Sequence, residues 1–124
     1  MTSANSKNCI LVVDDEADIR ESLREAVEMV GCTALLAKDG RDALRVLGQH
    51  RPCLIILDLM MPNMTGAELL QEMRLQPDLA ELPVIISTSA PAQAPAGVPV
   101  LPKPIDLRAF WARIRQNCDC SATP

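Results

Sequence analysis

Three aspartates follow apolar runs of the sequence and together have the chemistry of a cation site. Asp14 and Asp15 come after residues 9–13, and Asp58 comes after residues 53–57. An unbroken apolar run is typical of a strand buried on both faces, and parallel sheets carry their chemistry at the carboxyl ends of such strands. Three carboxylates in one pocket need a counter-charge, and Mg²⁺ prefers oxygen ligands of this kind. Taken alone, Asp58 could equally well be the residue that caps the following helix.

The hydrophobic pattern predicts the strands and helices that would bring these aspartates together. Strands are expected at residues 9–13, 33–37, 53–57, 84–88 and 98–101, and helices at 17–30, between 40 and 48, at 66–75 and at 105–117, the last capped by Asp106. Alternating strands and helices favour an α/β fold with a doubly wound, five-stranded parallel sheet. In the flavodoxin-like order 2-1-3-4-5, the first and third strands are neighbours, so the three aspartates would meet in one crevice.

The connection between the fourth and fifth strands does not fit this alternation. Only nine residues, 89–97, separate the two predicted strands, and Pro91 and Pro95 stand within them. A full helical crossover needs about 10 to 12 residues, and proline interrupts helices. We therefore expect an irregular crossover with a single helical turn at most, so that the usual helix is shortened or missing.

Two further side chains are expected at the same edge of the sheet. Thr88 ends the fourth predicted strand, and Lys103 follows the fifth and precedes Pro104. They would add a hydroxyl and a positive charge to the carboxylates. A slip of one residue would put Ser89 in place of Thr88, and Lys103 could instead be an ordinary surface lysine.

Length and composition limit the functions that this chain could have. The 124 residues suit one domain at 9–117, with polar tails at 1–8 and 118–124. The net charge of −4 and the 2% aromatic content argue against binding to nucleic acid. Neither a membrane span nor the apolar segment of a signal peptide is evident, so a cytoplasmic protein without membrane contacts is expected.

The chain has five cysteines, an odd number. In a cytoplasmic protein, reduced thiols are the expected state. Cys118 and Cys120 form a C-x-C pair without a second pair at metal-ligand spacing, which argues against zinc.

The combination of motifs resembles the receiver domain of two-component response regulators. The resemblance rests on Asp14-Asp15, on Asp58 in the segment D-x-x-M-P-x-M-x-G (58–66), on Thr88 and on Lys103-Pro104. It covers residues from about 9 to 117. No single motif is specific, but the set in this order is.

The resemblance implies a role for each of these residues. Asp58 would accept a phosphoryl group from a histidine kinase or a histidine phosphotransfer protein. Asp15, Asp58 and the backbone carbonyl of Met60 would bind Mg²⁺, and Asp14 would hold its waters. Lys103 would pair with the acyl phosphate, and the Thr88 hydroxyl would donate to a phosphoryl oxygen. The family's bond between Lys103 and Pro104 is cis, which the sequence permits.

Several positions depart from the family pattern. Val100 stands where an aromatic switch residue is frequent, and Ser89 stands where a small residue is usual. Met60 and Ala90 occupy two positions that influence how water reaches the acyl phosphate. Neither side chain orients water by hydrogen bonding, so slow self-dephosphorylation is expected.

These observations lead to three hypotheses for the function. The first is a phosphoacceptor that signals through protein contacts and catalyses only its own phosphorylation and slow dephosphorylation. Its kinase would dock at the first helix and at the loop before the last helix. The second is a binding module that works without phosphorylation. The third is a phosphohydrolase, which would need a cap or substrate pocket that 124 residues do not provide. The sequence leaves open whether the chain is complete or part of a longer regulator or hybrid kinase.

Overall fold

A parallel β-sheet of five strands forms the centre of the computed structural model, which describes residues 7–120. Its strand order is β2-β1-β3-β4-β5, as predicted. The strands are β1 (Cys9–Val13), β2 (Thr33–Ala37), β3 (Leu54–Asp58), β4 (Val84–Thr88) and β5 (Val100–Pro102). Because all of the pairs are parallel, the carboxyl ends of the strands meet at one edge of the sheet.

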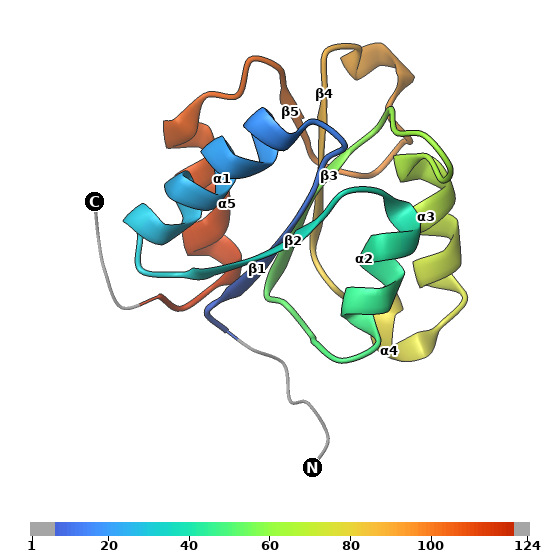
Figure 1. Cartoon of the computed structure of the whole chain (residues 1–124), viewed down its shortest axis with the longest axis horizontal. Helices are drawn as coiled ribbons and strands as arrows, with labels where there is room; N and C mark the ends of the chain where they lie inside the picture. Colours follow the sequence, from blue (N-terminus) through green and yellow to red (C-terminus); the bar gives the residue numbers. More distant parts are fainter. Residues whose placement is uncertain (1–6, 121–124) are drawn as a thin grey trace.

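Helices cover both faces of the sheet (Figure 1). On one face lie α1 (Ala17–Met29) and α5 (Leu107–Asn117), and on the other lie α2 (Gly40–Leu47), α3 (Gly66–Arg74) and the single turn α4 (Pro77–Ala80). The residues of β1 and β3 are buried throughout and alternate between the two apolar cores. Burial on both faces explains why the sequence of these strands is apolar without a break. None of the helices within residues 7–120 has the length and apolar character to cross a bilayer.

Side-chain caps fix where the helices near the carboxyl edge begin. Thr65 and Glu68 form a reciprocal capping box at the start of α3. The carboxylates of Asp39 and Asp106 accept backbone N–H groups at the starts of α2 and α5, so the predicted cap at Asp106 is confirmed.

The crossover from β4 to β5 is irregular, as predicted. Its regular structure consists of one short 3₁₀ turn, η1 (Pro91–Gln93). Strand β5 begins at Val100, two residues later than expected. Pro99 still accepts a hydrogen bond from the Ile86 N–H, but as a proline it has no N–H to donate. The turn α4, between α3 and β4, was not expected from the sequence.

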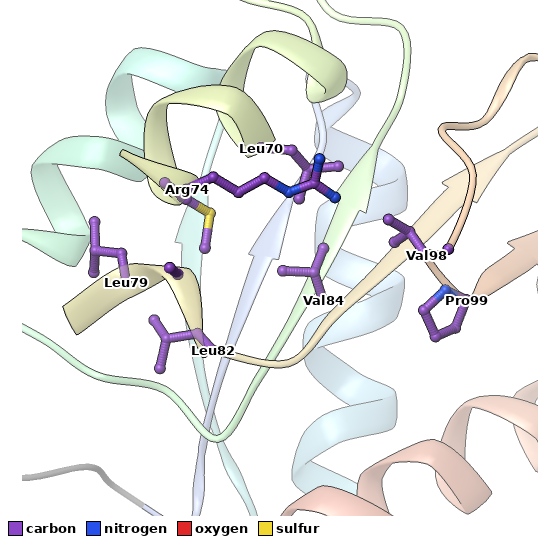
Figure 2. Close-up of a pocket in the computed structure, with 10 residues that line it drawn as sticks. Leu70, Arg74, Leu79, Leu82, Val84, Val98 and Pro99 are labelled. Carbon is purple, nitrogen blue, oxygen red and sulfur yellow. The ribbon is translucent and has the colours of Figure 1, made fainter. Parts of the chain in front are cut away.

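Without a regular helix in this crossover, a groove of about 180 Å³ stays open beside β4 (Figure 2). It lies between α3, α4 and the last part of the crossover, and its walls include Leu70, Leu79, Val84 and Val98. The side chain of Arg74 also lines the groove and extends from α3 in the direction of Leu70. At the groove Val84 is only partly buried, whereas Ile86, in the same apolar core, is fully buried.

The expectation of reduced cysteines is wrong for four of the five. The structure contains the disulfides Cys32–Cys120 and Cys53–Cys118, and Cys9 is a buried free thiol. The paired cysteines are 88 and 65 residues apart, so only the folded topology brings them together. The expectation relied on compartment and spacing, which say nothing about such distant contacts. For the predicted tails at 1–8 and 118–124, residues 1–6 and 121–124 lie outside the described part of the chain.

Candidate functional site

The three aspartates meet at the carboxyl edge of the sheet, as the sequence predicted. One carboxylate oxygen from each of Asp14, Asp15 and Asp58 lies within 4.8 Å of the others. Asp14 and Asp58 are buried, whereas Asp15 is exposed. An oxygen-rich cluster with one open side suits a hard cation that keeps some of its waters.

Several hydrogen bonds hold Asp14 in place. Its backbone N–H donates to the Ala37 carbonyl of β2, 3.1 Å away, and its carbonyl accepts from Nη1 of Arg20 at 2.7 Å. Its Oδ1 accepts the Glu16 N–H at 2.9 Å. Nothing in the sequence indicated that Arg20 would take part in the site, because this contact forms only when α1 packs beside the end of β1.

Lys103 reaches this cluster from the end of β5. Its Nζ lies 3.1 Å from Oδ2 of Asp14 and 3.5 Å from Oδ1 of Asp58. The bond between Lys103 and Pro104 is cis. The alternative that Lys103 is an ordinary surface lysine is wrong, because its side chain is only 19% exposed and contacts two buried carboxylates.

The electrostatics of the site are those of a pocket with surplus negative charge. Burial, followed by repulsion from Asp14, raises the pKa of Asp58 from its ordinary value of 3.8 to about 6, against the opposing charge of Lys103. Burial on its own would lower the pKa of Lys103. The hydrogen bond to Asp14 and the charges of both aspartates outweigh that effect, so the net shift of the Lys103 pKa is upward. A cation would relieve the repulsion between the carboxylates.

Thr88 is buried at the last position of β4, and its carbonyl accepts the Lys103 N–H at 2.9 Å. Its Oγ1 accepts the Ala90 N–H at 3.0 Å, so the hydroxyl hydrogen stays available as a donor. The alternative residue, Ser89, is exposed and lies beyond the strand. The register therefore puts Thr88, and not Ser89, at the strand end beside Lys103.

The loop after Asp58 folds back closely on that residue. Oδ1 of Asp58 accepts the Met60 N–H at 3.3 Å, while the Met60 side chain is 61% exposed. A Cβ atom on Gly66 would lie 2.6 Å from the Asp58 carbonyl oxygen, too close for any other residue. The glycine that ends the motif therefore lets α3 start directly against the backbone of Asp58.

Ser87 is a polar residue of this region to which sequence reasoning gave no role. It pairs with Asp58 in the register of β3 and β4, and it is buried. Within the part of the chain that the structure describes, its hydroxyl oxygen has no hydrogen-bond partner. The sequence offers three hydroxyl residues in a row, 87–89, and only the strand register tells them apart.

Comparison with known proteins agrees with this geometry. Residues 10–115 match the family model of the response regulator receiver domain. The response regulator MprA of Mycolicibacterium vanbaalenii is 38% identical over 113 residues, which cover 86% of this chain and 48% of MprA. The chain thus spans about half the length of the curated relatives it matches.

Solved structures show the same fold. The signal receiver domain of a signal transduction histidine kinase from Syntrophus aciditrophicus has a TM-score of 0.78 and 30% identity, over 88% of each chain. The Vibrio cholerae chemotaxis protein CheY4 has a TM-score of 0.78 and 26% identity, over 92% of this chain and 99% of its own. With the family model, the sheet order and the acidic cluster in agreement, this chain belongs to the family of response regulator receiver domains.

Proposed function

We propose that this chain is a phosphoacceptor in a two-component phosphorelay, with Asp58 as the residue that is phosphorylated. The observation that carries the proposal is the position of Lys103, which approaches both Asp14 and Asp58 inside a cluster of three carboxylates. A structural ion pair would need one carboxylate. A cluster of three carboxylates, two of which contact one lysine, instead suits a site that gains a phosphoryl group and a metal ion.

In the proposed reaction, a carboxylate oxygen of Asp58 attacks the phosphorus of a phosphohistidine. A P–O bond forms as the P–N bond breaks, and the electron pair of the P–N bond stays on the imidazole nitrogen. Lys103 would compensate the negative charge of the resulting acyl phosphate as a point charge. The Thr88 hydroxyl, which already accepts the Ala90 N–H, would donate its hydrogen to a phosphoryl oxygen.

The same residues fit a Mg²⁺ ion. Asp15, Asp58 and the Met60 carbonyl would be its direct ligands, and Asp14 would hold its waters. When bound, the ion would neutralise negative charge on the phosphoryl oxygens. The pKa of Asp58 is raised first by burial and then by repulsion from Asp14, and a bound cation would oppose both effects by favouring the ionised carboxylate.

Intact-mass measurement after incubation with Mg²⁺ and a small phosphodonor such as acetyl phosphate tests the proposal. We expect the wild type to gain one phosphoryl group and Asp58→Asn to gain none. The matched control is Asp119→Asn, which removes an exposed carboxylate beyond α5 and should be labelled like the wild type. An adduct that persists in Asp58→Asn would contradict the assignment, and continuous turnover of the donor would favour the phosphohydrolase.

For the phosphodonor protein, we propose docking at α1 and the loop before α5. A depression of about 270 Å³ lies there, with Ile19, Leu23, Pro104 and Ile105 among its lining residues. Because Lys103 also lines it, a docked histidine would be close to Asp58. Ile105→Glu should slow labelling by any histidine kinase that labels the wild type and leave labelling by acetyl phosphate unchanged. Equal loss with both donors would argue against docking at this surface.

A phosphorylation-independent binding module is the second candidate function. The shortened crossover and Val100 favour it. In the family, the helix of this crossover and an aromatic residue at the position of Val100 transmit the state of the site to the surface, and this chain has neither as a regular feature. The absence of any adduct in the wild type would support this candidate. Either function is proposed for a cytoplasmic protein that catalyses, at most, its own phosphorylation and dephosphorylation.

A further inference from the structure

The five cysteines gather at the edge of the sheet opposite to the acidic site. Cys9 begins β1, and Cys32 and Cys53 immediately precede β2 and β3. The Cys53 N–H donates to the Cys9 carbonyl at 2.8 Å, so these strand starts are adjacent. Since the strands are parallel, their amino ends lie a full strand length from Asp58.

The segment that follows α5 is fastened to this edge at three points. Cys118 is bonded to Cys53, and Cys120 is bonded to Cys32. Between them, the Asp119 N–H donates to the Lys7 carbonyl at 2.6 Å. The two cysteines of the C-x-C segment are thus bonded to cysteines at the starts of two different strands.

We propose that these two disulfides are a redox-responsive clasp, opened by a dithiol reductant, that fastens residues 118–120 to the sheet. In each pair one cysteine is buried, Cys32 or Cys53, and the other is half-buried, Cys120 or Cys118. The half-buried cysteine of each pair is the one that an attacking thiolate would approach. Disulfides in cytosolic proteins are mostly transient, catalytic or redox-sensing rather than structural.

The chemistry of opening is a two-electron exchange for each bond. A thiolate of the dithiol attacks the half-buried sulfur, the protein S–S bond breaks, and a mixed disulfide forms. The second thiolate of the reductant then closes its own disulfide and releases the protein sulfur. Each protein disulfide gains two electrons and two protons, and each dithiol molecule loses the same.

Opening should free the segment without dismantling the domain. Phe110 and Ile114 stay buried against the sheet, and the Trp111 side-chain N–H still donates to the Ala26 carbonyl of α1. The disulfides close loops of 65 and 88 residues, so losing both should lower Tm by on the order of 10 °C. The carboxylate cluster makes none of these contacts, so labelling of Asp58 by acetyl phosphate should be unchanged by reduction.

The experiment equilibrates the full chain with graded ratios of reduced and oxidised dithiothreitol, traps thiols with N-ethylmaleimide and maps the peptides by mass. We expect the peptide pairs Cys53–Cys118 and Cys32–Cys120 on the oxidised side, with Cys9 as the one free thiol. On the reduced side all five cysteines should be alkylated after denaturation.

Matched variants separate the clasp from general effects of the reductant. Cys9→Ser removes the unpaired thiol and should keep the full fall in Tm on reduction. The double variant Cys118→Ser, Cys120→Ser removes one partner of each bond, and its Tm should not respond to reductant. Different cysteine pairs, an absence of cross-linked peptides at every ratio, or an equal Tm response in the double variant would each overturn the proposal.

Discussion

The carboxyl edge of the sheet and the crossover from β4 to β5 are neighbours in the chain, and they are held in very different ways. At the edge, Asp14 makes hydrogen bonds to β2, to α1 and to Lys103, and it is almost fully buried. In the crossover, η1 is exposed, and only Ala94 and Val98 pack partly against the core. Contacts from several elements thus fix the conformation of the edge. The conformation of the crossover is fixed mainly by hydrogen bonds within its own backbone.

This contrast shows which part of the receiver fold determines the geometry of the site. The residues of the site come from the ends of β1, β3, β4 and β5, so they keep their places without a regular helix after β4. The last strand pairs through Ile86 and Thr88, whatever path the chain takes between them.

The largest effect is expected from Lys103→Met, which removes the positive charge of the site and keeps a side chain of similar length. The rate of labelling by acetyl phosphate should fall on the order of 100-fold, because the charge of the phosphoryl group loses its nearest protein partner. The measurement is the initial rate of the phosphorylated species by intact mass. Lys38→Met, at an exposed lysine after β2, is the control. A Lys103→Met variant labelled like the wild type would show that Lys103 has a structural role only.

The second prediction concerns the dependence of stability on pH. The pKa of Asp58 is about 6 in the folded chain and close to 3.8 when unfolded, so between these values the folded state holds the proton more tightly. The free energy of unfolding should therefore fall as pH rises from about 4 to 6, by at most about 3 kcal/mol from this group. Urea unfolding of the wild type and of Asp58→Asn isolates the contribution of this carboxylate to the pH dependence, because the other carboxylates of the two proteins are the same.

We expect Asp58→Asn to be the more stable protein at pH 7, and the gap to close near pH 4. Mg²⁺ should stabilise the wild type at pH 7 and have little effect on Asp58→Asn, since an ion bound only by the folded state raises its stability. Equal stability of the two proteins at pH 7 without Mg²⁺ would mean that burial and repulsion do not raise the pKa of Asp58 as described.

The sequence predicted the site better than it predicted the surroundings of the site. Asp14, Asp58 and Lys103 each follow a strand, and parallel strands bring their ends together whatever the detailed packing. The register that puts Thr88 beside Lys103 comes from the same rule. Ser87 escaped notice because burial and an unpaired hydroxyl are properties of the packed sheet, which a run of hydroxyl residues does not specify.

The cysteines show where sequence reasoning ended. Nothing in the spacing of Cys32 and Cys120 indicates a contact, because 88 residues of chain lie between them. The late start of β5 had a local cause, the missing N–H of Pro99, that strand propensity alone does not reveal. Long-range cysteine pairing and the missing N–H of a proline are thus two kinds of feature that the sequence pattern did not reveal.

Substitution of two glycines tests whether the edge and the crossover differ in their tolerance of an added side chain. A methyl group on Gly66 would meet the Asp58 carbonyl, so Gly66→Ala should lower the free energy of unfolding by about 1–3 kcal/mol and also slow labelling. Gly97 has a φ of +81° and open space around it, so Gly97→Ala should cost about 1–2 kcal/mol from backbone strain and leave labelling unchanged. Urea unfolding and labelling rates check both. Slower labelling in Gly97→Ala would mean that the crossover and the site are coupled.

The smallest effect is expected at two positions beside the site, Met60 in the loop after Asp58 and Ala90 at the start of the crossover. Met60 is exposed beside Asp58, and the Ala90 N–H is bonded to the Thr88 hydroxyl. Neither side chain positions water, so the acyl phosphate should outlast a timescale of seconds. Met60→Asn should shorten its lifetime by about tenfold, which is less than a dedicated general base provides. Loss of the adduct is followed by intact mass, with Met29→Asn, at an equally exposed methionine of α1, as the control. If Ala90→Asn shortens the lifetime more than Met60→Asn does, water reaches the phosphoryl group from the side of the crossover, and its open structure takes part in ending the signal.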